Sequence, residues 1–114
     1  MAKVIVIDSL AKEIKKKFSV SEADKIADLM QSLEENPYKG KLLTTVGGIV
    51  VKELKYNNFR FYFITDGFRL KCLNVEELTD LLLKFVRMSD KNYQQQTINE
   101  IKQILRLIGP SGFR

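Results

Sequence analysis

The residues available for chemistry in this chain are limited by the complete absence of histidine. That absence excludes Ser-His-Asp triads, the commonest zinc sites and the usual imidazole base of ribonucleases. The acidic residues show no paired spacing that predicts a metal site, and there is no phosphate-binding Walker loop, so we expect no metal and no other cofactor. Any catalysis must therefore use lysine, arginine, tyrosine or carboxylate side chains.

The charge of the chain favours an anionic partner. Nineteen lysines and arginines against 14 aspartates and glutamates give a net charge of +5, and the isoelectric point is about 9.4. Such an excess is typical of domains that bind nucleic acid. Ribosomal and thermophilic proteins can show the same balance, so charge alone leaves both interpretations open.

Length and cysteine content indicate one domain in a reducing compartment. The chain has 114 residues, and its single cysteine, Cys72, excludes an internal disulfide. The residues around Cys72 fit a strand. The longest apolar runs are too short to span a bilayer, and the first residues lack a signal-peptide pattern, so we expect a cytoplasmic protein with no membrane contact.

The first 37 residues predict a strand followed by a helical hairpin. Residues 4–7 form an apolar, β-branched run, and Asp8-Ser9 then offers an N-cap. A break at residues 19–21 separates two apolar stripes, with Ser21 as the expected cap of the second helix. The stripes consist of Leu10, Ile14 and Phe18, and of Ile26, Leu29, Met30 and Leu33. The second stripe ends before Asn36-Pro37, because proline restricts the residue before it.

The middle of the chain predicts an antiparallel meander. Asn57-Asn58 and Asp66-Gly67 provide tight turns between β-rich segments. With the N-terminal strand, these segments predict a five-stranded, mainly antiparallel sheet. The four segments are residues 49–56, 59–65, 68–74 and 79–88.

A terminal helix is expected at residues 94–108, because an apolar stripe repeats there and Gly109-Pro110 stops it. The fold class is therefore α+β, with an N-terminal strand, an α-helical hairpin, an antiparallel β-meander and a C-terminal helix. Residues 1–110 are expected to form a single domain, and residues 111–114 a loose tail.

Alternation along one strand predicts which face of the sheet carries polar chemistry. Phe59, Phe61 and Phe63 share one face, whereas Arg60 and Tyr62 lie on the other. The aromatic row is expected to pack under the helical hairpin. The other face is then expected to stay partly open. The predicted common core consists of Ile14, Phe18, Ile26, Met30, Phe61 and Phe63.

Four short motifs follow one another in this frame, at residues 36–42, 48–55, 58–63 and 82–91. They read Asn-Pro-Tyr-Lys-Gly-Lys-Leu, Gly-Ile-Val-Val-Lys-Glu-Leu-Lys, Asn-Phe-Arg-Phe-Tyr-Phe and Leu-Leu-Lys-Phe-Val-Arg-Met-Ser-Asp-Lys. With the order of elements, they resemble the RelE/ParE superfamily of bacterial and archaeal toxins. The last motif resembles the ending of its HigB-like, phage-derived branch, and the whole likeness implies a RelE-like fold.

The chain departs from this family pattern in three places. Met88 stands where a second lysine is usual, and Asn92-Tyr93 replaces Thr-Pro. A few residues are also inserted around positions 74–80.

The resemblance implies the toxin component of a toxin–antitoxin pair, an endoribonuclease that cuts mRNA, commonly on the ribosome, and is silenced by an antitoxin protein. In such cleavage the 2′-hydroxyl of the RNA attacks the neighbouring phosphate. A base, an acid and cations that stabilise the phosphorane are required. A homodimer is a further alternative for the assembly.

Four residues are the expected catalytic set. Arg60 and Arg87 suit the phosphorane, because guanidinium keeps its proton and matches two phosphate oxygens. Lys91 is a candidate acid or phosphate clamp if it is buried near Arg87. Tyr93 is expected to stack on a base or to transfer a proton. The alternatives are a strand arginine lying over Tyr62, a solvated turn lysine, and a tyrosine covering the last helix.

Six more residues are expected to contact RNA from the strands, although each on its own is more often part of a solvated face. They are Lys52, Lys55, Tyr62, Arg69, Lys71 and Lys84.

Two other functions remain open. A ParE-like inhibitor of a topoisomerase would share the fold and cut nothing. A non-catalytic RNA-binding module is suggested by the departures at Met88 and Asn92-Tyr93. The converging cations favour the ribonuclease.

Overall fold

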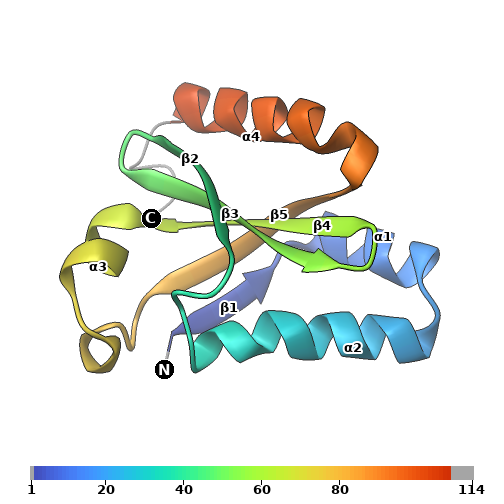
Figure 1. The fold of residues 1–114 in the computed structure, drawn as a ribbon, viewed down its shortest axis with the longest axis horizontal. Helices are drawn as coiled ribbons and strands as arrows, with labels where there is room; N and C mark the ends of the chain where they lie inside the picture. Colours follow the sequence, from blue (N-terminus) through green and yellow to red (C-terminus); the bar gives the residue numbers. More distant parts are fainter. Residues whose placement is uncertain (1, 109–114) are drawn as a thin grey trace.

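The computed structural model describes residues 2–108, apart from the side chains of residues 75 and 108 (Figure 1). The expected tail at residues 111–114 lies outside the described residues. In chain order the elements are β1 (Lys3–Val6), α1 (Asp8–Lys17), α2 (Val20–Gln31), η1 (Ser32–Glu34), β2 (Lys41–Val46), β3 (Ile49–Tyr56), β4 (Phe59–Asp66), α3 (Gly67–Cys72), η2 (Val75–Glu77), β5 (Leu82–Asp90), η3 (Lys91–Tyr93) and α4 (Gln94–Ile108).

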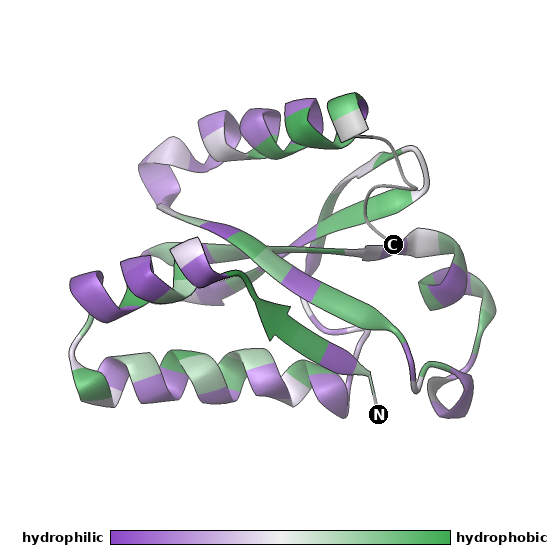
Figure 2. Ribbon diagram, turned by 180° about the vertical axis from the view of Figure 1, so that it is seen from behind, coloured by the Kyte–Doolittle hydropathy of each residue, from purple (hydrophilic) through white to green (hydrophobic). Residues whose placement is uncertain are grey.

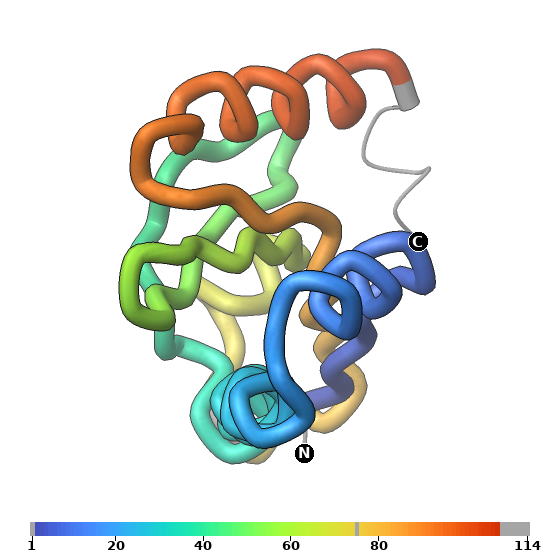
Figure 3. The backbone as a smooth tube through the Cα atoms, turned by 90° about the vertical axis from the view of Figure 1, so that its right-hand side faces the viewer, coloured from blue at the N-terminus to red at the C-terminus, as the bar shows by residue number. Residues whose placement is uncertain are grey.

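A five-stranded sheet forms the middle layer of an α+β arrangement. Its strand order is β1-β5-β4-β3-β2, with β1 parallel to β5 and every other pair antiparallel. The α1–α2 hairpin packs on one side of the sheet and α4 on the other (Figures 1 and 3). The predicted α+β class and the mainly antiparallel, five-stranded sheet are confirmed.

The helical hairpin forms as predicted, but its caps differ. The first helix begins at Asp8 with Ile7 as its N-cap and has no side-chain cap. The second begins at Val20, because the Ser19 hydroxyl accepts a hydrogen bond from the Glu22 N–H at 3.2 Å. Ser19 and Glu22 have the spacing of a capping box, so this pair outcompetes the predicted cap at Ser21.

The predicted strand at residues 68–74 is wrong, because the chain forms the helix α3 there. The Asp66 side chain accepts hydrogen bonds from the N–H groups of Phe68 and Arg69, at 3.1 and 3.2 Å. Asp66-Gly67 is therefore a helix start and not a hairpin turn. As a consequence, Cys72 ends a helix instead of lying in a strand.

The sheet reaches five strands through β2, which was not among the predicted strands. Gly47 and Gly48 have φ values of +56° and +84°, which makes a tight turn between β2 and β3. The last strand begins at Leu82, three residues later than its predicted start at Thr79. The terminal helix forms over the predicted range.

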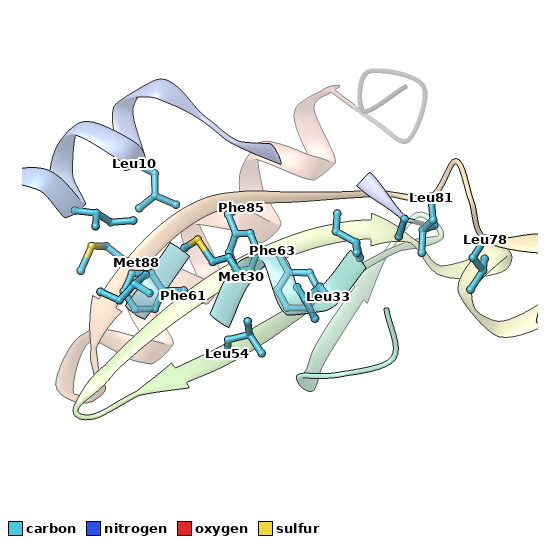
Figure 4. Close-up of a cluster of buried hydrophobic side chains, with 14 residues drawn as sticks. Leu10, Met30, Leu33, Leu54, Phe61, Phe63, Leu78, Leu81, Phe85 and Met88 are labelled. Carbon is cyan, nitrogen blue, oxygen red and sulfur yellow. The ribbon is translucent and has the colours of Figure 1, made fainter. Parts of the chain in front are cut away.

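The larger core lies between the hairpin and the sheet (Figure 4). Phe61 and Phe63 are fully buried there and meet the buried residues Ile14, Ile26 and Met30. Phe18 packs against this cluster and meets the Phe59 ring edge-on, with 4.9 Å between the centroids. The predicted common core is confirmed. Figure 2 shows the corresponding hydrophobic colouring along the strands and the hydrophilic colouring on outer helix turns.

A second core closes the other face of the sheet, which was predicted to be partly open. Tyr62 and Ile64 pack there against Ile98, Ile101 and Leu105 of α4. The prediction was wrong because it assigned no partner surface to the apolar stripe of α4. In the structure this stripe packs on the face that was predicted to be partly open.

Truncation of the central aromatic row should destabilise the domain. We expect Phe61→Ala to lower the free energy of unfolding by about 3–5 kcal/mol, because it opens a cavity in a fully packed core. Phe68→Ala, at a side chain that is 71% exposed, is the matched control and should change it by less than about 0.5 kcal/mol. Urea unfolding followed by circular dichroism measures both, and equal effects would contradict the assignment of the core.

Candidate nucleic-acid interface

A polar groove of about 510 Å³ lies between β2 and the start of α4. Lys41, Lys91 and Lys102 line it, and no carboxylate of the described residues does so. The N-terminal end of a helix adds partial positive charge from its free N–H groups. We call this site the basic groove; its other lining residues are Leu42, Leu43, Asn92, Gln94, Gln95 and Ile98.

The turn that carries Lys91 is held in place from two sides. The Asp90 carboxylate accepts hydrogen bonds from the N–H groups of Asn92 and Tyr93, at 2.8 and 3.2 Å. The Lys91 N–H donates to the Asn58 carbonyl at 3.0 Å, which ties the turn to the β3–β4 hairpin. Lys91 and Tyr93 are both exposed. Lys91 therefore lacks the burial that its role as an acid was expected to need.

Arg60 lies next to a buried carboxylate. Its Nε is 3.9 Å from Glu53 Oε2, and the two side chains are 14% and 7% exposed. Gln94 of α4 donates to the same Glu53 oxygen at 2.9 Å, and an Arg60 Nη1 donates to the Phe59 carbonyl at 3.2 Å. Since Gln94 also lines the basic groove, the Glu53–Arg60 pair lies directly behind the groove wall.

Tyr62 is fully buried, so its predicted contact with RNA is wrong in this structure. Its hydroxyl is 2.8 Å from Ser89 Oγ, which in turn donates to the Asp90 carbonyl at 2.9 Å. Burial is the main cause that raises the pKa of the phenol above its ordinary value of 10.0. Tyr62 is a neutral core residue below α4.

Arg87 and Lys84 lie in a different cleft. They line a space of about 180 Å³ between β5 and the later turns of α4, with Ile104 at the same cleft. A register shift between β4 and β5 occurs next to Arg87, and Arg87 Nη1 donates to the Val86 carbonyl at 2.8 Å. Arg87 is not among the residues that line the basic groove with Lys91.

The remaining predicted RNA contacts are divided between places. Lys52 Nζ donates to the Tyr38 carbonyl at 2.8 Å, and burial lowers the pKa of this ammonium. Lys52 and Lys71 line a third cleft, described below. Lys71 and Arg69 belong to the helix α3 and not to a strand. Lys55 is exposed on β3.

Several residues of the basic groove and of its wall were not predicted from sequence. Lys41 was missed because β2 was missed, although Thr44, Thr45 and Val46 ahead of Gly47-Gly48 are a recognisable strand-and-turn signal. Lys102 and Gln94 line the groove because α4 packs next to β2, and the sequence of α4 alone does not predict that position. Glu53 lies opposite Tyr62 in the β3–β4 register, so both side chains are on the same face of the sheet. The alternation of side chains that pointed to Tyr62 therefore also points to Glu53.

Comparison of the chain with family models, with curated proteins and with solved structures finds no match. Within residues 2–108, no helix is long and apolar enough to cross a membrane. The same residues contain no cluster of three or more cysteine and carboxylate side chains that could hold a metal ion.

Tyr62 should make stability depend on pH in the alkaline range. A raised pKa in the folded state means that the unfolded chain releases the phenolic proton first. The stability contributed by the neutral phenol is therefore complete below pH 10.0 and is lost as the pH rises beyond it. Tyr62→Phe should cost about 1 kcal/mol at pH 7 by loss of the hydrogen bond. Its unfolding free energy should then fall less steeply than that of the wild type above that pH. Urea unfolding from pH 7 to 11 measures the difference, and parallel curves would contradict it.

Proposed function

We propose that the protein is a toxin-type endoribonuclease of the RelE/HigB-like kind that binds single-stranded RNA in the basic groove and cleaves it by attack of the RNA's own 2′-hydroxyl. The basic groove carries this proposal: three lysines line it, and none of the carboxylates that the structure describes does. Phosphate binding is the function that such a charge distribution supports best. The partner that silences this activity would be an antitoxin protein.

Aromatic stacking is the second element of the proposed RNA site. Tyr93 is 59% exposed and ends the short turn that begins with Lys91. A phenol ring can stack on an unpaired base of any sequence, at about 1–3 kcal/mol per base. Lys91 and Tyr93 together therefore suit one nucleotide, with the phosphate on the lysine and the base on the ring.

The Glu53–Arg60 pair is the proposed source of the chemistry. In a chain without histidine, a carboxylate is the remaining strong candidate for accepting the 2′-hydroxyl proton. Arg60 would stabilise the extra negative charge of the phosphorane. Lys91 would hold the phosphate, and the departing 5′-oxygen would take its proton from solvent, which leaves a 2′,3′-cyclic phosphate on the upstream fragment. Gln94 must release Glu53 when substrate enters.

The burial of this pair agrees with a functional role. Two charges taken out of water recover their lost hydration only with excellent geometry, so a buried ion pair is weak evidence for stability. Ionisable groups that are buried at this cost in hydration cluster at functional sites.

A non-catalytic RNA-binding module is the second candidate. One observation favours it: Glu53 already neutralises Arg60 in this structure. RNA binding without cleavage would support this function, whereas inhibition of a topoisomerase without RNA contact would support the ParE-like one.

RNA binding should depend on the groove lysines and on salt. Replacement of Lys41, Lys91 or Lys102 by Gln should each weaken binding of a fluorescent single-stranded oligonucleotide. Each loss should also reduce the slope of log affinity against log salt by about 0.7. Lys25→Gln, at an exposed lysine of α2, is the control and should behave as wild type. Affinity that does not change with salt would exclude phosphate binding.

Cleavage should persist in excess chelator and leave 2′,3′-cyclic phosphate ends. Glu53→Gln keeps the shape of the carboxylate and should lower the rate by about 10²–10⁴, the scale of a lost catalytic acid or base. Arg60→Lys keeps the charge and loses the fork of the guanidinium, and should lower the rate comparably to a lost oxyanion donor, about 10²–10³. Glu100→Gln, at an exposed carboxylate of α4, is the control.

These rates are measured by mapping mRNA ends in a translating extract, with RNA affinity and urea unfolding measured on the same variants. Lower turnover at unchanged affinity and stability supports the catalytic pair. Full cleavage by Glu53→Gln and Arg60→Lys would exclude it.

A further inference from the structure

A large apolar cleft lies on the side of the sheet away from α4, between β2, β3 and α3. Its volume is about 730 Å³, and the Lys52 ammonium on its wall lies 5.8 Å from the ring centroid of the core residue Phe63. We call it the β2–α3 cleft. It is lined by Tyr38, Leu42, Thr45, Gly48, Val50, Lys52, Gly67, Phe68, Leu70 and Lys71.

The rim of the β2–α3 cleft exposes large apolar side chains. Phe68, Leu42 and Tyr38 are 71%, 58% and 43% exposed. Single exposed apolar residues are ordinary on protein surfaces, but a cluster of them around one hollow marks a site of contact with another molecule. The cleft is therefore a candidate docking surface.

The walls of the cleft are fixed by contacts that need no partner. The Gly67 N–H donates to the Gly48 carbonyl at 2.9 Å, which joins the start of α3 to the β2–β3 turn. A Cβ at Gly67 would lie 2.7 Å from Val50 Cγ2, so this approach requires glycine. The Tyr38 hydroxyl donates to the Leu73 carbonyl at 2.8 Å across the other wall. A preformed hollow of this kind binds without a large ordering cost.

The edge of the sheet runs along one wall. β2 is the last strand in the sheet order, and in the part of the chain that the structure describes it pairs with β3 alone. An edge strand offers backbone groups to an extended chain, and side chains of that chain can enter pockets on one face at every second residue. The neighbourhood of an apolar hollow and a sheet edge suits a peptide in extended conformation.

The positive charge at the cleft favours an acidic occupant. Within residues 2–108, Lys52 and Lys71 are the charged residues that line the cleft, and the chain carries a net charge of +5. A second copy of this chain would bring the same sign of charge, whereas an acidic segment would be attracted. RNA would also be attracted, but a lining composed mainly of aliphatic and aromatic side chains favours apolar side chains over sugar and phosphate.

We propose that the β2–α3 cleft binds an extended acidic segment of a protein partner, which pairs with the edge of β2 and inserts alternate apolar side chains between Leu42 and Phe68. Apart from Leu42, which lines both, the surface is separate from the basic groove, and its occupation does not depend on RNA cleavage.

Three fluorescein-labelled heptapeptides test the proposal by anisotropy. The first alternates glutamate with leucine, the second replaces each glutamate by lysine, and the third replaces each leucine by serine. The first should bind saturably and at least about tenfold more tightly than either of the others. Amide NMR shifts on binding should centre on Thr45, Gly48 and Phe68. No saturable binding of the first peptide up to millimolar concentration, or shifts centred on the basic groove, would overturn the proposal.

Variants of the rim separate the cleft from other apolar surface. Leu42→Ser and Phe68→Ser should each weaken the acidic peptide by at least about fivefold. Leu107→Ser, at an 81% exposed leucine on α4, is the matched control and should leave its affinity unchanged. Equal losses in all three variants would overturn the proposal, as would competitive displacement of the peptide by oligouridylate. Sedimentation of the free protein as a dimer that Phe68→Ser dissociates would assign the cleft to a second copy instead.

Discussion

The structure depends on the burial of β4 on both of its faces. Phe61 and Phe63 lie under the helical hairpin, while Tyr62 and Ile64 lie under α4. Because successive side chains of a strand point to opposite sides, one strand of alternating large residues holds two helical layers together. The hairpin and α4 contact the same sheet and not each other's cores. Disruption of β4 would therefore remove the support of both.

The charged pair Glu53–Arg60 lies at one end of the sheet face that α4 covers. The β4 face that carries Tyr62 also carries Arg60, nearer the β3–β4 turn. There the first turn of α4 supplies Gln94, and β3 supplies Glu53. The guanidinium is consequently held between a buried core and the basic groove. An arginine fixed in this way is oriented before any ligand arrives, which is the condition under which charge stabilisation in a transition state is strongest.

The strand β2 separates two surfaces with different chemistry. Leu42 lines both the basic groove and the β2–α3 cleft. One surface is polar and rich in lysine, and the other is mainly apolar and borders the last strand of the sheet order. The two surfaces suit different partners, so a ligand on one side need not resemble a ligand on the other.

Local sequence determined most of the elements of this protein. The four-residue spacing of Leu10 and Ile14, the alternation from Phe59 to Phe63 and the stripe of α4 each follow from a period that one segment contains by itself. The five residues predicted to be buried with Phe18 form the larger core for the same reason. The absence of histidine and the positive charge likewise limit the possible chemistry without any coordinates.

Tertiary structure determined the features that the periodicity of a single segment does not specify. Residues 68–74 are rich in strand-forming side chains, yet the Asp66 cap and the contact of Gly67 with Gly48 stabilise a helix there. Tyr62 became a core residue because α4 docks on its face. Five of the eight predicted cations were divided among three clefts. Strand register and helix docking determine which side chains meet, and neither is encoded in the spacing of one segment.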